Sequence, residues 1–335
     1  MSINREDSYI FSSSLMRAGE KTLLPEDRII KAAEAGSFRE ACAVIEEYGY
    51  GGEKNGIEPE NFEDILGERE RESIREVLSA LPDSGELGFL MCPADYHNAK
   101  VILKSSFLGR DPDKYLTARG NIEPEKMKAM IRERDLAFLP GELAAAIDEA
   151  SEVFGKGRDP QEIDLILDRA CYKQMLREAE ESGSDFLLGY VRLLIDTINI
   201  CSFVRLRQIQ KPWSFFRKVF IDGGNIKEEV FISSYEEPYK QAADKMQPYG
   251  FDGVMREGAV RAAETGLYDL LEKLCDNKRI EYIRQAKFVS FGVEPAAAFI
   301  IARESEIKNL RVILSGKKTG TPDEVILERL RKTYV

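Results

Sequence analysis

The sequence contains a single histidine, His97, among 335 residues. One histidine excludes the HExxH zinc motif, which needs two, and makes a Ser-His-Asp triad an unfavoured interpretation. We expect His97 to have a polar or capping role. The common histidine-dependent hydrolytic centres therefore find no support in this sequence.

Cysteines are also few and widely spaced. They are odd in number and never form a Cys-x-x-Cys pair, so the pattern favours free, buried thiols in a reducing compartment. The five positions are Cys42, Cys92, Cys171, Cys201 and Cys275.

Long apolar runs are scarce. We expect no stretch to approach the roughly 20 apolar residues that span a bilayer, and the nearest is the short segment 296–302. The first seven residues contain no apolar signal core. We therefore expect any membrane association to pass through a partner, without a direct membrane span.

A nucleotide-binding loop is lacking. The residues Gly316-Lys317-Lys318-Thr319 resemble part of a P-loop, but the motif needs a glycine where this sequence has Arg311. A helix, and not the required strand, is predicted before them. We expect no nucleotide or other cofactor.

Metal chemistry has only weak support. Asp164 and Asp168 share one face of a predicted helix, yet no second acidic motif faces them. Acid pairs on a highly charged helix are usually solvated, so we expect no metal site and no catalytic residue.

An excess of basic charge is missing as well. The 48 lysines and arginines face 59 acidic residues, which leaves a net charge of -11. This balance argues against a nucleic-acid partner, because phosphate binding needs a basic face. One basic, aromatic segment, residues 211–218, is either a packing segment after a helix or a contact patch, and the sequence leaves both open.

Helix signals, by contrast, recur along the whole chain. Pro25, the pair Ser37 and Glu40, Asp159-Pro160 and Thr321-Pro322 each predict a helix start. Residues 186–209 predict one long apolar helix, and the short run 230–232 fits a helical turn. Without hairpin signals, the sequence predicts an all-α fold.

A long internal repeat in the sequence indicates how the chain is divided into domains. An acid, two further residues and an asparagine precede an apolar helical stripe three times. A Gly-Asn-Ile block follows the first two copies and begins at Gly120 and Gly224, which lie 224 − 120 = 104 residues apart. The first two asparagines lie 199 − 98 = 101 residues apart, so two separate blocks support one period. The repeat residues are Asp95 and Asn98, Asp196 and Asn199, and Glu306 and Asn309.

The repeat predicts three helical units of about 100 residues, a common domain size. Their expected bounds are 1–125, 126–230 and 231–335, with the N-terminal segment free to pack with the last unit. A looser block at Gly320-Thr321 follows the third copy. The segment from Glu58 to Asn61 also fits much of the acid-and-asparagine pattern, so this pattern alone is weak support for a repeat.

Two interpretations of the repeat residues remain open. Each acid can simply lie in the first turn of a helix, where the helix dipole favours it. Alternatively, each buried amide makes hydrogen bonds that fix the packing of its unit, because an unpaired buried amide costs about 1–3 kcal/mol.

The chain resembles the C subunit of the bacterial and archaeal V/A-type ATPases, the relative of the d subunit of the eukaryotic V-ATPase, over essentially its whole length. Two local departures are Pro93, expected to interrupt the helix before Asp95, and Lys104, where the second copy has Arg205. The resemblance rests on the three repeat helices, on residues 9–17 before Leu23-Leu24, on the Asp164 and Asp168 helix, and on residues 330–334.

The resemblance implies three similar helical bundles arranged as a funnel about a pseudo-threefold axis. It implies a non-catalytic central-stalk connector on the cytoplasmic face of the membrane, with the proteolipid rotor ring and the central shaft as partners. ATP-driven ion transport or ATP synthesis would occur elsewhere in the complex. Two rival interpretations are a helical adaptor unrelated to rotary ATPases and a helical metal-dependent enzyme.

Overall fold

The computed structural model describes residues 8–51 and 56–335, and within these ranges the chain forms helices and turns without a β-strand. The predicted all-α class is confirmed. Local capping explains several helix starts. The Ser37 side chain accepts a hydrogen bond from the Glu40 N–H at 3.2 Å, at the start of α4 (Phe38–Glu46). The Asp159 side chain accepts one from the Gln161 N–H at 2.9 Å, at the start of α9 (Pro160–Glu181).

The contacts divide the chain into two compact units. The terminal unit combines the residues up to Ser84 with those from Tyr239 to Val335, and the middle unit runs from Gly85 to Pro238. Each unit is described by itself below. The division into three units at residues 125/126 and 230/231, about a pseudo-threefold axis, stays a prediction.

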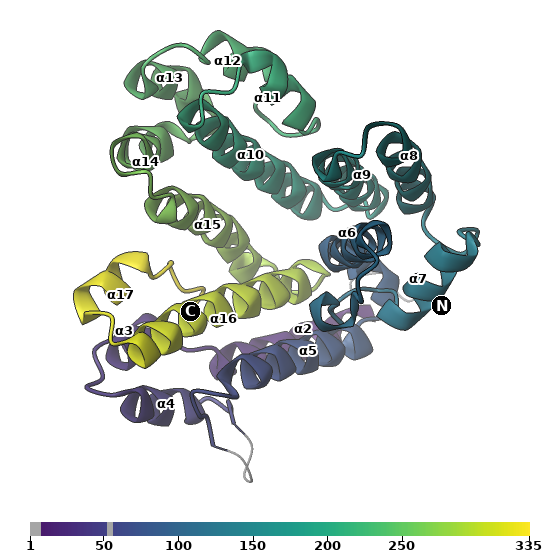
Figure 1. Cartoon of the computed structure of the whole chain (residues 1–335). Coiled ribbons are helices and arrows are strands. Elements are labelled where there is room, and N and C mark those ends of the chain that lie inside the picture. The colour runs from purple at the N-terminus through teal and green to yellow at the C-terminus, as the bar shows by residue number, and fades with distance from the viewer. Residues whose placement is uncertain (1–7, 52–55) are drawn as a thin grey trace. The chain divides into compact units, whose positions relative to one another are not determined.

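The terminal unit is built around the long helix α16 (Glu294–Thr319), which is mostly buried. The helices α2, α3, α4 and α5 all pack against α16 although they lie near the other end of the sequence (Figure 1). The remaining helices of this unit are α2 (Ile10–Gly19), α3 (Glu26–Ala33), α5 (Phe62–Ala80), α13 (Tyr239–Met246), a π-helical segment (Val254–Ala259), α14 (Val260–Thr265), α15 (Asp269–Ile283) and α17 (Asp323–Arg329).

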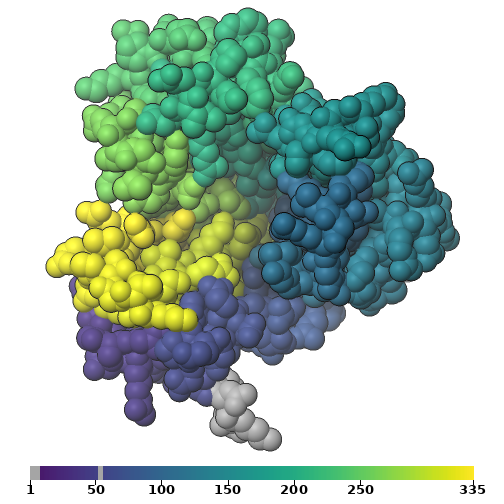
Figure 2. Space-filling view, in the orientation of Figure 1, coloured from purple at the N-terminus to yellow at the C-terminus, as the bar shows by residue number. Residues whose placement is uncertain are grey.

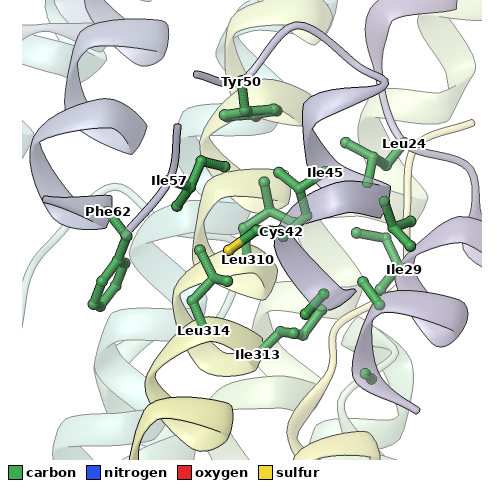
Figure 3. Packing of buried hydrophobic residues seen from close by; sticks show 14 of the residues in the cluster. Leu24, Ile29, Cys42, Ile45, Tyr50, Ile57, Phe62, Leu310, Ile313 and Leu314 are labelled. Atoms are coloured by element: carbon green, nitrogen blue, oxygen red, sulfur yellow. The ribbon is translucent and has the colours of Figure 1, made fainter. Parts of the chain in front are cut away.

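One hydrophobic core joins these N-terminal helices to α16. Leu310, Ile313 and Leu314 follow the three- and four-residue spacing of one helix face, and all are fully buried. Figure 3 shows them facing Cys42 and Ile45 of α4. Burial of apolar side chains from both ends of the sequence therefore holds the terminal unit together.

The middle unit is a bundle in which α8 packs on α9, and α9 packs on both α6 and α10. The long helix predicted over 186–209 is α10, and the run 230–232 lies in a helix, as expected. Its helices are α6 (Cys92–Leu108), α7 (Pro124–Glu133), α8 (Gly141–Gly157), α9, α10 (Asp185–Gln208), α11 (Trp213–Val219) and α12 (Glu228–Ser233).

An aromatic cluster beside α10 includes Phe216 of the basic, aromatic segment 211–218. Phe216 is fully buried, and its ring centroid lies 5.8 Å from that of Phe203 and 5.4 Å from that of Phe231. Trp213 is 43% exposed. Phe216 therefore packs in the interior, whereas six of the eight residues of the segment are exposed, so a contact patch on the segment stays a prediction.

Two sequence expectations need correction. Pro93 does not interrupt a helix, because α6 begins at Cys92 and Pro93 lies in its first turn, where a proline N–H is not needed. By length and composition, α10 could cross a membrane, so the expectation that no segment approaches a span was wrong. This composition is only weak support for a membrane span. In the most apolar part of α10, 56% is buried inside the protein, and the core helices of other proteins have a similar composition.

Candidate functional site: three asparagine clamps

Asn98 lies on α6 and is fully buried. Its Nδ2 donates a hydrogen bond to the Thr117 carbonyl at 2.8 Å, and its Oδ1 accepts one from the Thr117 N–H at 2.9 Å. One side chain thereby satisfies both backbone groups of a residue in the connector that follows the helix. We call this pair of bonds an asparagine clamp.

The same clamp occurs twice more. Asn199 on α10 bonds to the carbonyl and the N–H of Ile221 at 2.8 and 3.0 Å. Asn309 on α16 bonds to those of Arg331 at 3.0 and 2.8 Å. In both cases the partner lies 22 residues downstream, since 221 − 199 = 331 − 309 = 22.

Asn61, which fits the same sequence frame, makes no clamp. Its Oδ1 accepts a hydrogen bond from the Glu58 N–H at 2.8 Å, and its Nδ2 donates to the Gly56 carbonyl at 3.2 Å. Both contacts are exposed and join two different residues of a local turn. Asn61 therefore provides a matched control for the clamp residues.

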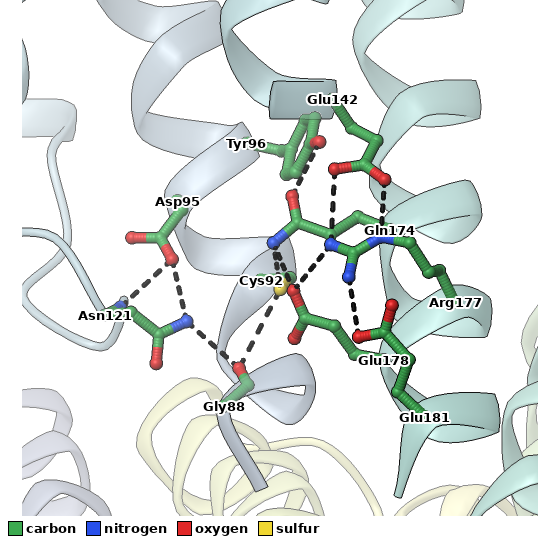
Figure 4. A network of polar contacts seen from close by, with 10 residues as sticks. All are labelled: Gly88, Cys92, Asp95, Tyr96, Asn121, Glu142, Gln174, Arg177, Glu178 and Glu181. Carbon is green, nitrogen blue, oxygen red and sulfur yellow. Dashed lines mark hydrogen bonds and ion pairs between the residues drawn. The ribbon is translucent and has the colours of Figure 1, made fainter. Parts of the chain in front are cut away.

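The aspartates of the first two copies hold the Gly-Asn-Ile blocks. Asp95 accepts hydrogen bonds from the N–H and side-chain amide of Asn121, both at 3.0 Å, and Figure 4 shows this contact. Its other oxygen accepts one from the Ile122 N–H at 3.0 Å. Asp196 repeats the pattern with the N–H and side chain of Asn225 at 3.1 and 2.8 Å, and with the Ile226 N–H at 2.9 Å.

The glycine of each block is required by close approach. A Cβ placed on Gly120 would clash with Oδ1 of Asp95, and one placed on Gly224 would clash with Oδ1 of Asp196. Any side chain at either position would push the carboxylate away from the N–H groups that it binds. This explains why a glycine begins both blocks.

Glu306, the acid of the third copy, has different partners. It accepts hydrogen bonds from the Leu24 N–H, from the Tyr50 hydroxyl at 2.6 Å and from the Arg303 guanidinium. Arg303 also donates to the Thr22 hydroxyl at 2.6 Å. Glu306 thus holds the N-terminal segment and not a downstream block.

The Gly320 block is therefore no counterpart of the other two. Gly120 and Gly224 each lie three residues after the clamped residue, whereas Gly320 precedes Arg331. Gly320 instead ends α16 in a left-handed conformation, with φ of 71°. The looser sequence match behind the third copy reflected a helix C-cap.

Burial has the largest influence on the pKa of each of the three acids. It raises the pKa of Asp95 and of Asp196, although the hydrogen bonds from the Gly-Asn-Ile blocks act in the opposite direction. Burial also raises the pKa of Glu306, against the effect of the Arg303 guanidinium. The pKa of Tyr50 is raised by burial and by the Glu306 carboxylate, so its hydroxyl stays protonated and donates.

A first-turn position does not explain the three acids. Asp95 does lie in the first turn of α6. Asp196 lies deep inside α10, and Glu306 lies deep inside α16, beyond the reach of the helix N-terminus. The hydrogen-bonding interpretation of the repeat agrees with the contacts of all three copies.

The middle unit contains a further, partly buried polar network that the sequence did not reveal. The Tyr96 hydroxyl donates to the Gln174 Oε1 at 2.9 Å, and the Gln174 Nε2 donates to Glu178 at 2.8 Å. Arg177 on the same helix bonds to Glu142 at 2.6 Å (Figure 4). Together these bonds join α6, α8 and α9. Only a contact between distant helices gives these residues their role, so no local pattern could have identified them.

The other sequence candidates have structural roles. His97 bonds through Nε2 to the Tyr115 carbonyl at 3.0 Å, which confirms a polar role. Asp168 and Asp164 form ion pairs with Lys100 at 2.5 Å and with Lys104 at 2.6 Å. In the described ranges, no group of three or more His, Cys, Asp or Glu side chains is arranged to hold a metal ion.

The P-loop-like residues and the cysteines also have clear positions. Gly316 to Thr319 form the last turn of α16, and Lys317 bonds there to the Ala35 carbonyl at 2.5 Å and to Asp323 at 2.6 Å. All five cysteines are free thiols; four are buried and Cys201 is half-buried. Burial raises the pKa of Cys42 to about 12, which keeps this thiol protonated.

Comparison with known proteins agrees with this arrangement. Residues 13–329 match the profile of a family described as "ATP synthase (C/AC39) subunit". The chain belongs to this family. The match covers every clamp residue up to Asn309 and ends just before Arg331, so all three repeat helices lie within it.

Named relatives in this family cover most of the chain. The C subunit of a V-type sodium ATPase from Enterococcus hirae is 26% identical over 71% of this chain and 72% of its own length. The C subunit of an A-type ATP synthase from Pyrococcus abyssi is 23% identical over 96% of this chain and 89% of its own. The C subunit of a V-type ATP synthase from Thermus thermophilus is 22% identical over 97% and 98%.

Proposed function

We propose that this protein is the non-catalytic central-stalk connector of a V/A-type rotary ATPase. In this role it joins the rotating shaft to the membrane proteolipid ring, while other subunits perform ATP chemistry and ion transport. The observation that carries the proposal is the family match over residues 13–329, which includes all three repeat helices.

The clamps supply a physical reason why this fold suits a mechanical part. A connector has to transmit torque without its loops sliding along its helices. Each clamp fixes one connector residue to a buried helix through two hydrogen bonds, and opening it would leave a buried amide and a peptide group unpaired. Such a loss costs about 1–3 kcal/mol per group, so each connector is held in register.

We further propose that the three clamps mark equivalent positions of three related units, bounded near residues 125 and 230. The offsets support this. The clamp partners Thr117 and Ile221 lie 104 residues apart, as do Asn121 and Asn225, because 221 − 117 = 225 − 121 = 104. Two hydrogen-bonded pairs thus follow the same period as the sequence blocks.

On this proposal the protein is peripheral to the membrane, on its cytoplasmic face, and associates with it only through the complex. Helix α10 is the test case, because its composition fits a span. Its Asp196 and Asn199 are fully buried and bonded to the connector that follows the helix. Inserting α10 into a bilayer would break these bonds, which a lipid environment cannot replace.

The decisive experiment is purification of the tagged chain in detergent together with the other ATPase subunits of the same organism. We expect the chain to copurify with the proteolipid and the shaft subunits, and to leave the membrane when the complex is washed at low ionic strength with a chelator. The isolated chain should neither hydrolyse ATP nor bind protein-free liposomes. Direct liposome binding, or copurification without any ATPase subunit, would contradict the proposal.

A clamp variant sharpens this test. We expect Asn309→Ala to weaken coupling, so that complexes hydrolyse ATP with less ion transport per ATP than wild type. Asn61→Ala, the matched control with exposed bonds, should leave the ratio unchanged. An unchanged ratio in Asn309→Ala would show that the clamps have no part in torque transmission.

A further inference from the structure

A groove with a cavity volume of about 370 Å³ lies in the terminal unit, along the second half of α16. Its walls include α17 and the residues after it, and the C-terminal residues are drawn in yellow at the surface in Figure 2. Ligand sites have volumes of roughly 300–1,000 Å³, so the groove has room for several side chains of a partner. The lining residues are Lys308, Arg311, Val312, Ser315, Gly316, Thr319, Thr321, Ile326, Arg329 and Arg331.

The charge of this lining is opposite to that of the chain. Four of the ten lining residues are basic and none is acidic, whereas the whole protein has a net charge of -11. The basic residues come from two turns of α16, from the end of α17 and from the segment that follows. Each of these cations also pairs with a carboxylate outside the lining, namely Glu304, Glu63, Asp269 or Asp276. An acidic ligand would therefore be recognised by the N–H donors that these pairs leave unused.

Two arginines of the groove each contact, through Nε, a carboxylate that lies outside the lining. Arg311 contacts Glu63 at 2.8 Å through Nε, and Arg331 contacts Asp276 at 3.1 Å, also through Nε. In the described part of the chain, the two terminal NH₂ groups of Arg311 make no hydrogen bond. The guanidinium is therefore fixed in orientation and keeps donors for a second carboxylate.

The groove has an apolar floor. Ile326 of α17 is 1% exposed and lies so close to Gly316 that a Cβ there would clash with it. Val312 lies beside them, and the Thr319 and Thr321 hydroxyls meet at 3.0 Å at the other end. A cationic rim over an apolar floor fits a peptide with both carboxylates and apolar side chains.

We propose that this groove binds an acidic, amphipathic segment of a partner subunit, whose carboxylates contact Arg311 and Arg329 and whose apolar side chains rest on Val312. The proposal rests on the function proposed above, since it takes the partner from the same rotary complex. It adds the chemistry of the partner and the residues that recognise it.

The test compares the salt tolerance of assembled complexes. Complexes containing the wild-type chain, Arg311→Gln/Arg329→Gln or Arg311→Lys are immobilised through another subunit and washed with increasing NaCl. We expect the double variant to leave at a clearly lower salt concentration, with about tenfold weaker binding for the loss of two ion pairs. Arg311→Lys keeps the charge but loses the planar fork that can contact Glu63 and a second carboxylate together. This variant should leave at a salt concentration between those of wild type and the double variant.

The matched control is Arg71→Gln/Arg75→Gln on α5. It changes the net charge of the same unit by the same amount, and both arginines pair with Glu68 outside the groove. This control should release at the wild-type salt concentration. Thermal unfolding of the isolated chains checks that all variants fold.

The possible outcomes separate the two proposals. A wild-type chain that never joins the complex contradicts the proposed function together with the groove. A wild-type chain that joins, with both double variants released at the same salt concentration, contradicts the groove alone. If millimolar inorganic phosphate stabilises the isolated wild-type chain but not the groove variant, and salt release is unchanged, the groove binds a small oxyanion and the peptide proposal is wrong.

Discussion

The middle and terminal units use the same asparagine clamp but differ in what the neighbouring acid holds. In the middle unit, Asp95 and Asp196 each bind a Gly-Asn-Ile block that follows their own helix. In the terminal unit, Glu306 binds the Leu24 N–H, 282 residues upstream, together with Tyr50 and Arg303.

This difference shows how one position in a repeat can serve two purposes. Tyr334 lies three residues after Arg331, where the first two copies have the glycine of their block, so an aspartate at position 306 would not meet a Gly-Asn-Ile block there. Glutamate is longer by one methylene and reaches a backbone N–H on another segment. The third copy thereby fixes the N-terminal segment to α16, and the arginine beside it balances the buried charge.

The largest effect should come from the buried pair Arg303 and Glu306, whose side chains are 1% and 6% exposed. We expect Arg303→Met to lower the free energy of unfolding of the terminal unit by about 3–5 kcal/mol, because it leaves a buried carboxylate without its cation. The double variant Arg303→Met/Glu306→Leu should recover part of this loss. Hydrogen exchange of peptides from α16 measures the free energy of unfolding in the single and in the double variant. A loss in the double variant equal to the sum of the losses in Arg303→Met and Glu306→Leu alone would show that the pair is not coupled.

The clamps should be equal in the two units. We expect Asn98→Ala, Asn199→Ala and Asn309→Ala each to cost about 1–3 kcal/mol, because each leaves one buried peptide unpaired. Urea unfolding followed by circular dichroism measures the change, and Asn61→Ala is the control with an effect under about 0.5 kcal/mol. A cost at only one of the three positions would break the proposed equivalence.

The glycines should matter only where an aspartate binds the block. We expect Gly120→Ala and Gly224→Ala to destabilise the middle unit by about 1–3 kcal/mol through the clash with Asp95 or Asp196. The single tryptophan, Trp213, reports unfolding of this unit by fluorescence. Gly141→Ala, with open space around the new Cβ, should be neutral. Additive effects in Gly224→Ala/Asp196→Ala would contradict the clash, since removing the carboxylate makes room for the methyl group.

The smallest effect should be the pH dependence that Asp276 contributes to the stability of the terminal unit. Burial of Asp276 would raise its pKa, but Lys308, Arg279 and Arg331 outweigh this and hold the pKa below the ordinary aspartate value. A lowered pKa in the folded state contributes stability above the unfolded pKa of about 3.9, and this contribution is lost as the pH falls through the folded pKa.

Asp276→Asn tests that assignment. We expect it to lose about 1–2 kcal/mol at pH 7 and to lose less than wild type on acidification below about pH 4. Thermal unfolding across this range gives the difference between the two chains. Parallel curves for wild type and variant would show that Asp276 does not contribute to acid sensitivity.

Local features of the sequence were enough to predict the helical class and many helix starts, because capping residues act on the nearest turn. Ser37 and Asp159 accept the backbone N–H groups that their positions predicted. The repeat period also led to the six acid and asparagine positions.

Contacts between distant segments could not be predicted in the same way. No pattern near Glu306 indicates that its partners are Leu24 and Tyr50, because that contact depends on how the N-terminal helices pack on α16. The basic groove is similar. Its cations are spaced along α16 and beyond α17, and only the turn between these helices brings them to one surface.

The clamps also bear on how far sequences in this family can diverge. The three clamped residues, Thr117, Ile221 and Arg331, share no side-chain chemistry, because each asparagine bonds only to their peptide groups. Mutations at the clamped positions can therefore accumulate without loss of the contact, provided that the backbone stays in place. We expect homologous chains, including relatives as distant as 22% identity, to vary freely at these positions while keeping the asparagine.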